Sequence, residues 1–382
     1  MTLSNAILGY EPVLDRRRNI LATRLSVMAA NPARPLSAAR VYEELTPLWP
    51  VDAGPLLIDV AGAMPDEELL RIRPVSNCWL GMSVEVANQP AAADLLKPLR
   101  DAGYTLTLSG ALISRLPEQV ADQLMMTIVP AGTSAEPPFA CNAVQSLAEA
   151  ETAFAAGATA VIGWPVDGVA SKGDSSASNP SFEVIGRLLA MVNGDADAEA
   201  LEKVFKQDPS LSFRLLRYLN SAACGLRVEV QSIQHAVMMI GMKRLQKWLA
   251  LLLATAARDP DLKPLMFASL RRGLLLESLV GEVIGPDAKD EAFILGVFSL
   301  LDKLFGEPFE SLFERLQIPE SVYDALVGRT GQYMPYLRLA EVLEGGASER
   351  IDDLLGEAFV ERADFNTVLI KALGDASYTE NL

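Results

Sequence analysis

The chain has 382 residues, of which 50% are hydrophobic and 21% charged, and its formal net charge is −16. This length favours two domains over one, and the composition excludes an intrinsically disordered chain. The acidic balance repels phosphate backbones and anionic lipids, so it argues against nucleic acids and membrane surfaces as partners.

The first part of the chain alternates short apolar runs with helical stretches. The runs are apolar almost throughout, which is typical of parallel strands covered on both faces. The expected strands are Ala6–Leu14, Pro55–Val60, Cys78–Val86, Tyr104–Gly110, Met125–Pro130, Phe139–Val144 and Thr159–Trp164, and the expected helices are Ser37–Leu45, Ala91–Ala102 and Ser146–Ala156. This alternation predicts a closed, TIM-like α/β barrel over residues 1–166.

Residues 167–180 are rich in Gly, Ser and Asp and lack apolar periodicity, which predicts a linker. From residue 181 to 382 the pattern is almost wholly helical, which predicts a helical domain. The expected helices there include Phe182–Val192, Ala198–Phe205, Leu265–Ile284, Asp290–Phe305, Glu307–Leu316, Glu320–Val327, Pro335–Leu343 and Asp352–Leu373.

Local signals mark helix ends in this second half. Asp208 followed by Pro209 is a helix N-cap with proline at the first helical position. Asn220 and Ser221 are interpreted as a hydrogen-bonding device near a helix end. Ser232 caps a helix that Gly241 ends.

The chain contains one histidine, His235, and three cysteines far apart in sequence. A single imidazole excludes zinc hydrolases with paired histidine ligands and HD-type metal phosphohydrolases. We interpret His235 as an ordinary core or helix-surface residue. The N-terminus lacks the cationic and apolar segments of a secretory signal, and separated cysteines fit reduced thiols, so we expect a cytoplasmic protein.

The segment from Glu183 to Leu249 resembles the HDOD domain. The resemblance is carried by Asp208-Pro209-Ser210-Leu211, by Asn220-Ser221, and by Ser232-Ile233 through Ala236 to Ile240-Gly241. That family looks like an HD-type hydrolase fold that has lost its metal ligands. The signature residues, His235 among them, are therefore expected to be structural.

Two further segments resemble bacterial signalling proteins that join an EAL-type barrel to an HDOD domain. Gly9–Met28 is similar to the strand-turn-strand that opens the EAL family, and Ile294–Gly346 is similar to the C-terminal region of the two-domain proteins. EAL enzymes hydrolyse cyclic di-GMP with two divalent cations held by carboxylates at strand ends. Such a metal pair activates water and stabilises the displacement.

Most of the residues at the family's metal-binding positions are replaced in this chain. The signature Glu falls on Arg24, which puts a cation where a cation must bind. Asp59 and Glu85 are the two remnant metal-ligand candidates. The other family positions fall on Met82, Ser109, Gly110, Thr127, Val129, Asn142 and Ile162.

The resemblance therefore implies a degenerate EAL barrel followed by an HDOD domain, with no catalytic residues, no cofactor and no intact metal site. It implies a regulatory or scaffold role through interaction with another signalling protein. A cyclic di-GMP receptor, a residual cyclic di-GMP phosphodiesterase and a nucleic-acid-binding module are the alternatives.

Overall fold

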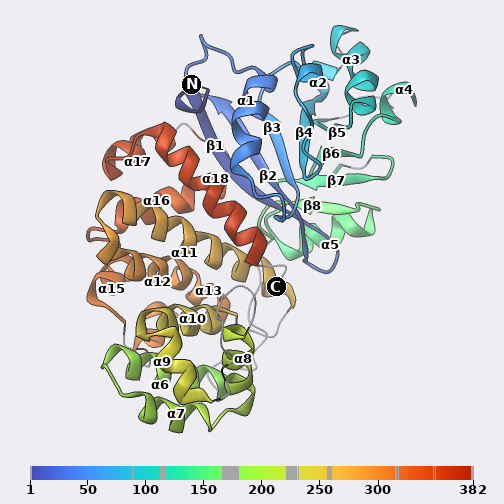
Figure 1. Ribbon diagram of the computed structural model, residues 1–382. Coiled ribbons are helices and arrows are strands. Elements are labelled where there is room, and N and C mark those ends of the chain that lie inside the picture. Colours follow the sequence, from blue (N-terminus) through green and yellow to red (C-terminus); the bar gives the residue numbers. More distant parts are fainter. Residues whose placement is uncertain are drawn as a thin grey trace. The chain divides into compact units, whose positions relative to one another are not determined.

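A computed structural model describes residues 2–87, 90–111, 118–133, 135–165, 180–220, 230, 232–255, 260–314, 316, 318–346, 348 and 350–379. The chain forms two compact units (Figure 1). One unit comprises Met1–Val169 and Pro335–Leu382, and the other comprises Ala170–Met334.

The first unit contains a closed barrel of eight strands in sequence order, which confirms the predicted α/β barrel. The strands are β1 (Ala6–Leu14), β2 (Ile20–Ala29), β3 (Leu56–Val60), β4 (Cys78–Ser83), β5 (Thr105–Ser109), β6 (Met126–Pro130), β7 (Phe139–Asn142) and β8 (Ala160–Ile162). Strands β2 to β8 run parallel, whereas β1 runs antiparallel to both its neighbours, β2 and β8. The opening strand-turn-strand is thus a β-hairpin.

Side chains alternate between the inside and the outside of the barrel. An inner cluster is formed by Val13, Ala22, Leu57, Met126, Ile128, Ala140, Ala160 and Ile162. An outer cluster joins β6 to β8 with α5 and includes Val129, Phe139, Cys141 and Phe154. Two residues along a strand return to the same face, so the inner cluster fixes which further residues point inward.

Five helices follow the barrel strands among the described residues: α1 (Ala38–Leu45), α2 (Val84–Ala87), α3 (Pro90–Asp101), α4 (Glu118–Ala121) and α5 (Leu147–Ala155). Their starts follow local chemistry. Ser37 caps α1 by accepting from the backbone N of Arg40, and Ser146 forms a reciprocal capping box with Glu149 at α5.

The C-terminal helices α16 (Met334–Leu343), α17 (Arg350–Ala358) and α18 (Arg362–Thr379) belong to the barrel unit, apart from Met334 itself. Figure 1 shows α18 beside β1. The buried Asn366 amide donates to the carbonyls of Leu3 (2.9 Å) and Ala6 (2.7 Å), at the start of β1. The sequence-based division placed all of residues 181–382 in one helical domain. The structure differs because the apolar stripes of this final segment cover the barrel.

The second unit is helical throughout its described residues. Its helices are α6 (Pro180–Asn193), α7 (Ala198–Phe205), α8 (Pro209–Leu219), α9 (Ile233–Ile240), α10 (Met242–Ala254), α11 (Lys263–Val283), α12 (Lys289–Phe298), α13 (Leu301–Phe305), α14 (Phe309–Phe313) and α15 (Glu320–Leu326). Short 3-10 helices occupy Leu3–Asn5, Thr46–Leu48, Leu69–Arg71, Pro260–Leu262 and Pro286–Ala288.

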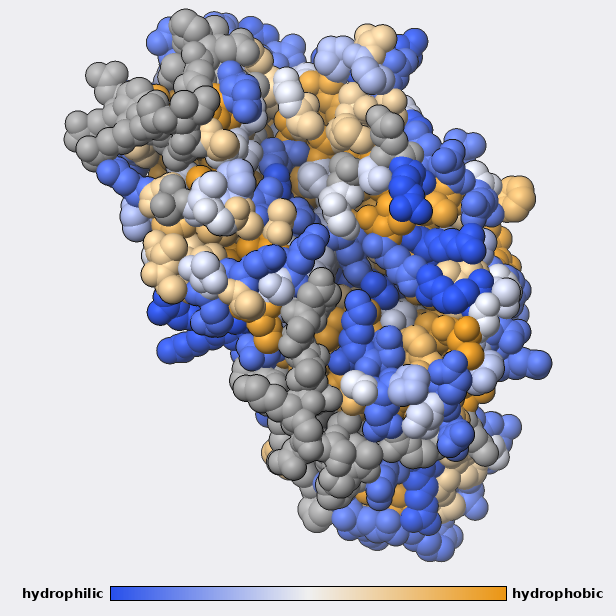
Figure 2. Space-filling view, turned by 180° about the vertical axis from the view of Figure 1, so that it is seen from behind, coloured by the Kyte–Doolittle hydropathy of each residue, from blue (hydrophilic) through white to orange (hydrophobic). Residues whose placement is uncertain are grey.

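On the face drawn in Figure 2, hydrophilic residues cover most of the surface and hydrophobic residues gather in separate areas between them. Within the part of the chain that the structure describes, every helix is too short or too polar to cross a lipid bilayer. The expected linker, residues 167–180, lies outside the described residues except for Pro180, which begins α6.

Candidate functional site

Arg24 lies at the centre of a polar network at the barrel mouth, where the parallel strands end. Its guanidinium donates from Nε and Nη2 to Oδ2 of Asp59, at 3.1 and 2.6 Å. Nη1 donates to Oδ1 of Asn142 at 2.8 Å and to Oε2 of Glu11 at 3.3 Å. One cationic side chain thus binds oxygens from β1, β3 and β7.

Strand register brings these four residues together. Each stands two positions from a member of the inner cluster, so Glu11, Arg24, Asp59 and Asn142 form the next inward layer towards the mouth. Glu11 faces Arg24 directly across the hairpin, after a bulge between Val13 and Leu14 shifts the register. The network is largely shielded, since the Arg24, Asp59 and Glu11 side chains are 12%, 11% and 15% exposed.

Burial changes the pKa of the Glu11 carboxyl. Removal from water raises the pKa of its carboxyl, and the negative charge of Asp59 adds to the rise, while Arg24 opposes it by its charge and its hydrogen bond. The desolvation effect wins, so the pKa of Glu11 lies above its usual value of 4.5. The single positive charge of Arg24 therefore compensates two carboxyl groups. Glu11, which has the longer hydrogen bond to Arg24, is the carboxyl whose pKa is raised.

Three of the family positions assigned from sequence face away from the mouth. Asp59 pairs in register with Gly81, so Gly81 points inward and Met82 points outward. Val129 belongs to the outer cluster, so Thr127, two residues earlier, faces outward as well. The assignment was therefore one residue out in β4 and β6. The inward residues there are Gly81, Ile128 and Pro130, which offer no carboxylate in place of the expected ligands.

The residues at the mouth do not fit two divalent cations. Metal ligation would need carboxylate oxygens free to bind, yet Asp59 and Asn142 direct oxygens at the Arg24 guanidinium. A second charge centre beside a fixed guanidinium would also be repelled. Among the described residues, no three His, Cys, Asp or Glu side chains form a group that could hold a metal ion.

The segment after α16 contacts the barrel strands near the mouth. The Trp164 indole, just past the end of β8, donates to the carbonyl of Glu344 at 2.8 Å. The Tyr10 hydroxyl donates to Oε1 of Glu344 at 3.4 Å, and the Tyr10 and Trp164 rings meet edge to face. A Cβ atom on Gly346 would lie 3.5 Å from Oγ of Ser26, two residues beyond Arg24 in β2. The segment therefore lies against β1, β2 and the end of β8.

The two remnant candidates are not brought together. Asp59 is part of the Arg24 network, whereas Glu85 lies in α2 with an exposed side chain, beyond the end of β4. Sequence reasoning did not single out Glu11. The hairpin could have suggested it, because residues on facing strands pair across a turn. If residue pairs are counted from the turn, starting at Leu14 and Ile20, and the bulge is ignored, Glu11 is placed opposite Thr23 instead of Arg24.

The HDOD signature residues serve helix ends in the second unit. Asp208 accepts from the backbone N of Leu211 at 3.0 Å, with Pro209 as the first residue of α8. The Asn220 amide bonds both backbone groups of Val230, donating to its carbonyl (3.0 Å) and accepting from its N (2.9 Å). Ser221 lies outside the described residues.

The remaining signature residues surround α9. Ser232 accepts from the backbone N of His235 at 3.2 Å, and the His235 side chain is half-buried. Gly241 ends α9 with a φ of 75°, a conformation that other residues adopt only with strain. These placements describe capped helices, and no two of the signature residues that the structure describes form a side-chain pair for acid–base chemistry.

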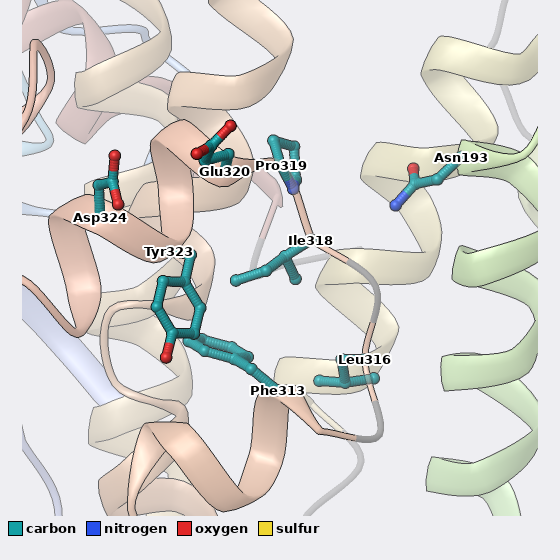
Figure 3. A pocket seen from close by; sticks show the side chains of 8 residues that line it. All are labelled: Asn193, Phe313, Leu316, Ile318, Pro319, Glu320, Tyr323 and Asp324. Carbon is teal, nitrogen blue, oxygen red and sulfur yellow. The ribbon is translucent and has the colours of Figure 1, made fainter.

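An open hollow of about 840 Å³ lies in the same unit (Figure 3). Its lining combines Phe313 and Tyr323, whose ring centroids are 6.1 Å apart, with Ile318 and the carboxylates of Glu320 and Asp324. Figure 3 shows the aromatic rings turned toward each other and Asn193 on the facing helix α6. None of the described residues that line the hollow is cationic, and the described lining offers apolar and acidic contacts.

Comparisons with known proteins agree with the architecture. A model of the HDOD domain matches residues 181–306. The Cyclic di-GMP phosphodiesterase CdgJ of Vibrio cholerae is 27% identical over 178 residues, which cover 47% of this chain and 41% of CdgJ. YuxH of Bacillus subtilis, described as uncharacterized, is 27% identical over 164 residues, which cover 41% of this chain and 39% of YuxH. The matches span about two fifths of these relatives' lengths.

Solved structures of EAL domains also match the chain. A standalone EAL protein from Vibrio cholerae O395, in a c-di-GMP bound form, shares 14% identity over 41% of this chain and 89% of its own, with a TM-score of 0.31. The EAL domain of FimX from Pseudomonas aeruginosa, bound to c-di-GMP, is 13% identical in sequence. This match covers 43% of this chain and 90% of the FimX domain, also with a TM-score of 0.31. From its own strand order and the family match, the chain combines an eight-stranded α/β barrel with an HDOD domain at residues 181–306.

Proposed function

We propose that this protein is a non-catalytic regulator or scaffold of bacterial signal transduction, acting in the cytoplasm through interaction with another signalling protein. Its barrel would be a degenerate EAL-type domain, and its HDOD domain would supply the docking surface. The observation that carries the proposal is the Arg24 network. A guanidinium bonded to Asp59, Asn142 and Glu11 takes up the space and the oxygens that a metal pair would need.

Cyclic di-GMP is the second candidate partner, because the relative CdgJ is described as a cyclic di-GMP phosphodiesterase. A receptor needs fewer groups than a phosphodiesterase, so loss of the metal ligands leaves binding possible. Calorimetry with cyclic di-GMP distinguishes the two roles, since micromolar or tighter binding would favour the receptor.

Hydrolysis of cyclic di-GMP with Mg²⁺ or Mn²⁺ tests the proposal. The intact chain should release no linear product above the level of a heat-denatured sample. The variant Glu85→Gln serves as the matched control, because Glu85 is the remnant candidate outside the network. Metal-dependent turnover by the intact chain that Asp59→Asn abolishes would refute the non-catalytic assignment.

A further inference from the structure

The HDOD domain contains a basic stretch within an acidic protein. Residues 209–258 hold seven Lys and Arg residues and one acidic residue, Glu229, although the whole chain carries a net charge of −16. Helices α8, α9 and α10, which belong to this stretch, contain no Asp or Glu at all. The charge of this stretch is therefore opposite in sign to that of the whole chain.

The outer face of α8 presents two aromatic rings and two guanidinium groups. Phe213, Arg214, Arg217 and Tyr218 recur at the spacing of one helix face, and all four are exposed. Phe213 is 64% and Tyr218 38% exposed, unusually high values for large hydrophobic residues. The opposite face buries Leu211, Leu215 and Leu219 in the domain core.

The charges on this face differ from those of neighbouring helices. On α7, Lys203 pairs with Glu199 and Lys206 pairs with Glu202. On α10, Lys243 and Lys247 both pair with Asp290. Within the described part of the chain, neither Arg214 nor Arg217 has an acidic partner. Their positive charge is thus available to another molecule.

The face is also held rigidly. Asp208 caps the start of α8, and Asn220 ties its end to Val230. The Tyr218 ring stacks on Trp248 of α10, with centroids 6.1 Å apart and planes inclined by 27°. Preorganised aromatic and arginine side chains are the composition of interface hot spots, because little conformational entropy is lost on binding.

We propose that the outer face of α8, formed by Phe213, Arg214, Arg217 and Tyr218, docks an acidic segment of a partner protein that carries apolar anchor residues. The inference rests on the proposed function and names the docking surface. The arginine forks would bind carboxylates, and the rings would cover the anchors. Two guanidinium groups are few for a nucleic acid, and the net charge of −16 opposes a phosphate backbone.

Fluorescence anisotropy with the full chain tests this surface. The probes are a labelled amphipathic peptide with Glu at its polar positions and Leu and Phe at its apolar positions, the same peptide with Lys for Glu, and a labelled single-stranded oligonucleotide. We expect saturable binding of the acidic peptide only. Arg214→Glu with Arg217→Glu should weaken that binding about tenfold or more, and Phe213→Ser should weaken it as well.

The matched control is Lys203→Glu with Lys206→Glu, which makes the same charge change on α7. It should alter the affinity less than about twofold, since only the global charge changes. Equal losses in the two double variants, absence of binding to the acidic peptide, or tighter binding of the oligonucleotide would overturn the inference. If the acidic peptide does not bind and the intact chain does not hydrolyse cyclic di-GMP, only the docking surface is refuted. If the intact chain hydrolyses cyclic di-GMP, the proposed function is refuted.

Discussion

At the residue scale, Arg24 does inside the barrel what a bound cation does in a metal site: it compensates carboxylates that strand geometry forces together. Asp59 and Glu11 point into the same layer of the barrel whatever lies between them. Because the guanidinium is part of the chain, this compensation requires no ligand. The network is therefore expected to contribute to folding stability.

Arg24→Met keeps the length of the side chain and removes its charge. Asp59 would then stay shielded without a counter-charge, so the free energy of unfolding should fall by about 3 kcal/mol. Urea unfolding at neutral pH measures the loss. Adding Asp59→Asn to the variant should recover part of it, and a loss below about 0.5 kcal/mol would mean that the network is not stabilising.

Glu11 predicts a specific pH dependence. Its folded-state pKa lies above the unfolded value, so the folded chain binds this proton more tightly than the unfolded chain does. The stability it contributes is present below the unfolded pKa and is lost as pH rises through the folded pKa. Glu11→Gln cannot titrate, so its stability relative to the unsubstituted chain should rise as the pH increases from the usual pKa of 4.5 through the raised folded-state pKa.

Unfolding of both proteins across this pH range gives the comparison. A stability difference that stays constant or falls as pH rises would show that burial does not dominate at Glu11. Asp59 provides no equivalent test on its own, because removing its carboxylate also breaks the shortest ion pair of the network.

The sequence could locate this site only in part. Arg24 and Asp59 were identified because the resemblance to the EAL family places two of its metal-ligand positions on them. Met82, Thr127 and Val129 were placed on the wrong face, because a slip of one residue inverts a strand and continuous apolar runs do not reveal such a slip. Glu11 was missed because the bulge that sets its partner leaves no clear signal in the sequence.

At the element scale, helix ends are where sequence and structure agree most closely. The start of α8 at Pro209 and the start of α9 at Ile233 follow from Asp208 and Ser232, whose side chains satisfy local backbone groups. The bond between Asn220 and Val230 spans a longer gap, and only the structure identifies its partner. It holds Val230, which precedes α9, at the end of α8.

Asn220→Ala removes both hydrogen bonds to Val230 while leaving α8 intact. We expect the HDOD domain to lose about 1–3 kcal/mol of stability. Thermal unfolding measures this loss, and Asn193→Ala, which removes an exposed bond to Gln246, is a control of the same chemistry. Equal effects from the two substitutions would show that the Asn220 bridge has no special role.

At the scale of the whole molecule, the chain forms the barrel strands, then the helical unit, and returns to the barrel unit with α16, α17 and α18. Asn366 and Arg362 bond the backbone of residues 3–6, far away in sequence. An amphipathic pattern shows that a helix has an apolar face but not which surface covers it, so this return could not be predicted from the sequence.

Ending the chain after Met334 should therefore damage the barrel more than the HDOD domain. The carbonyls of Leu3 and Ala6 would lose their buried donor, and the outer side of β1 would be uncovered. Hydrogen exchange should show faster exchange in β1 and β2, with little change in α10 to α12. Unchanged protection of β1 would contradict this account of the C-terminal segment.

The most direct test of the central claim, that Arg24 excludes a metal pair from the barrel mouth, is a Mn²⁺ titration followed by electron paramagnetic resonance. The intact chain at about 100 μM should leave the signal of free Mn²⁺ undiminished, whereas Arg24→Glu, which joins a third carboxylate to Glu11 and Asp59, should reduce it. Two Mn²⁺ ions bound per intact chain, and lost on Asp59→Asn, would contradict the account.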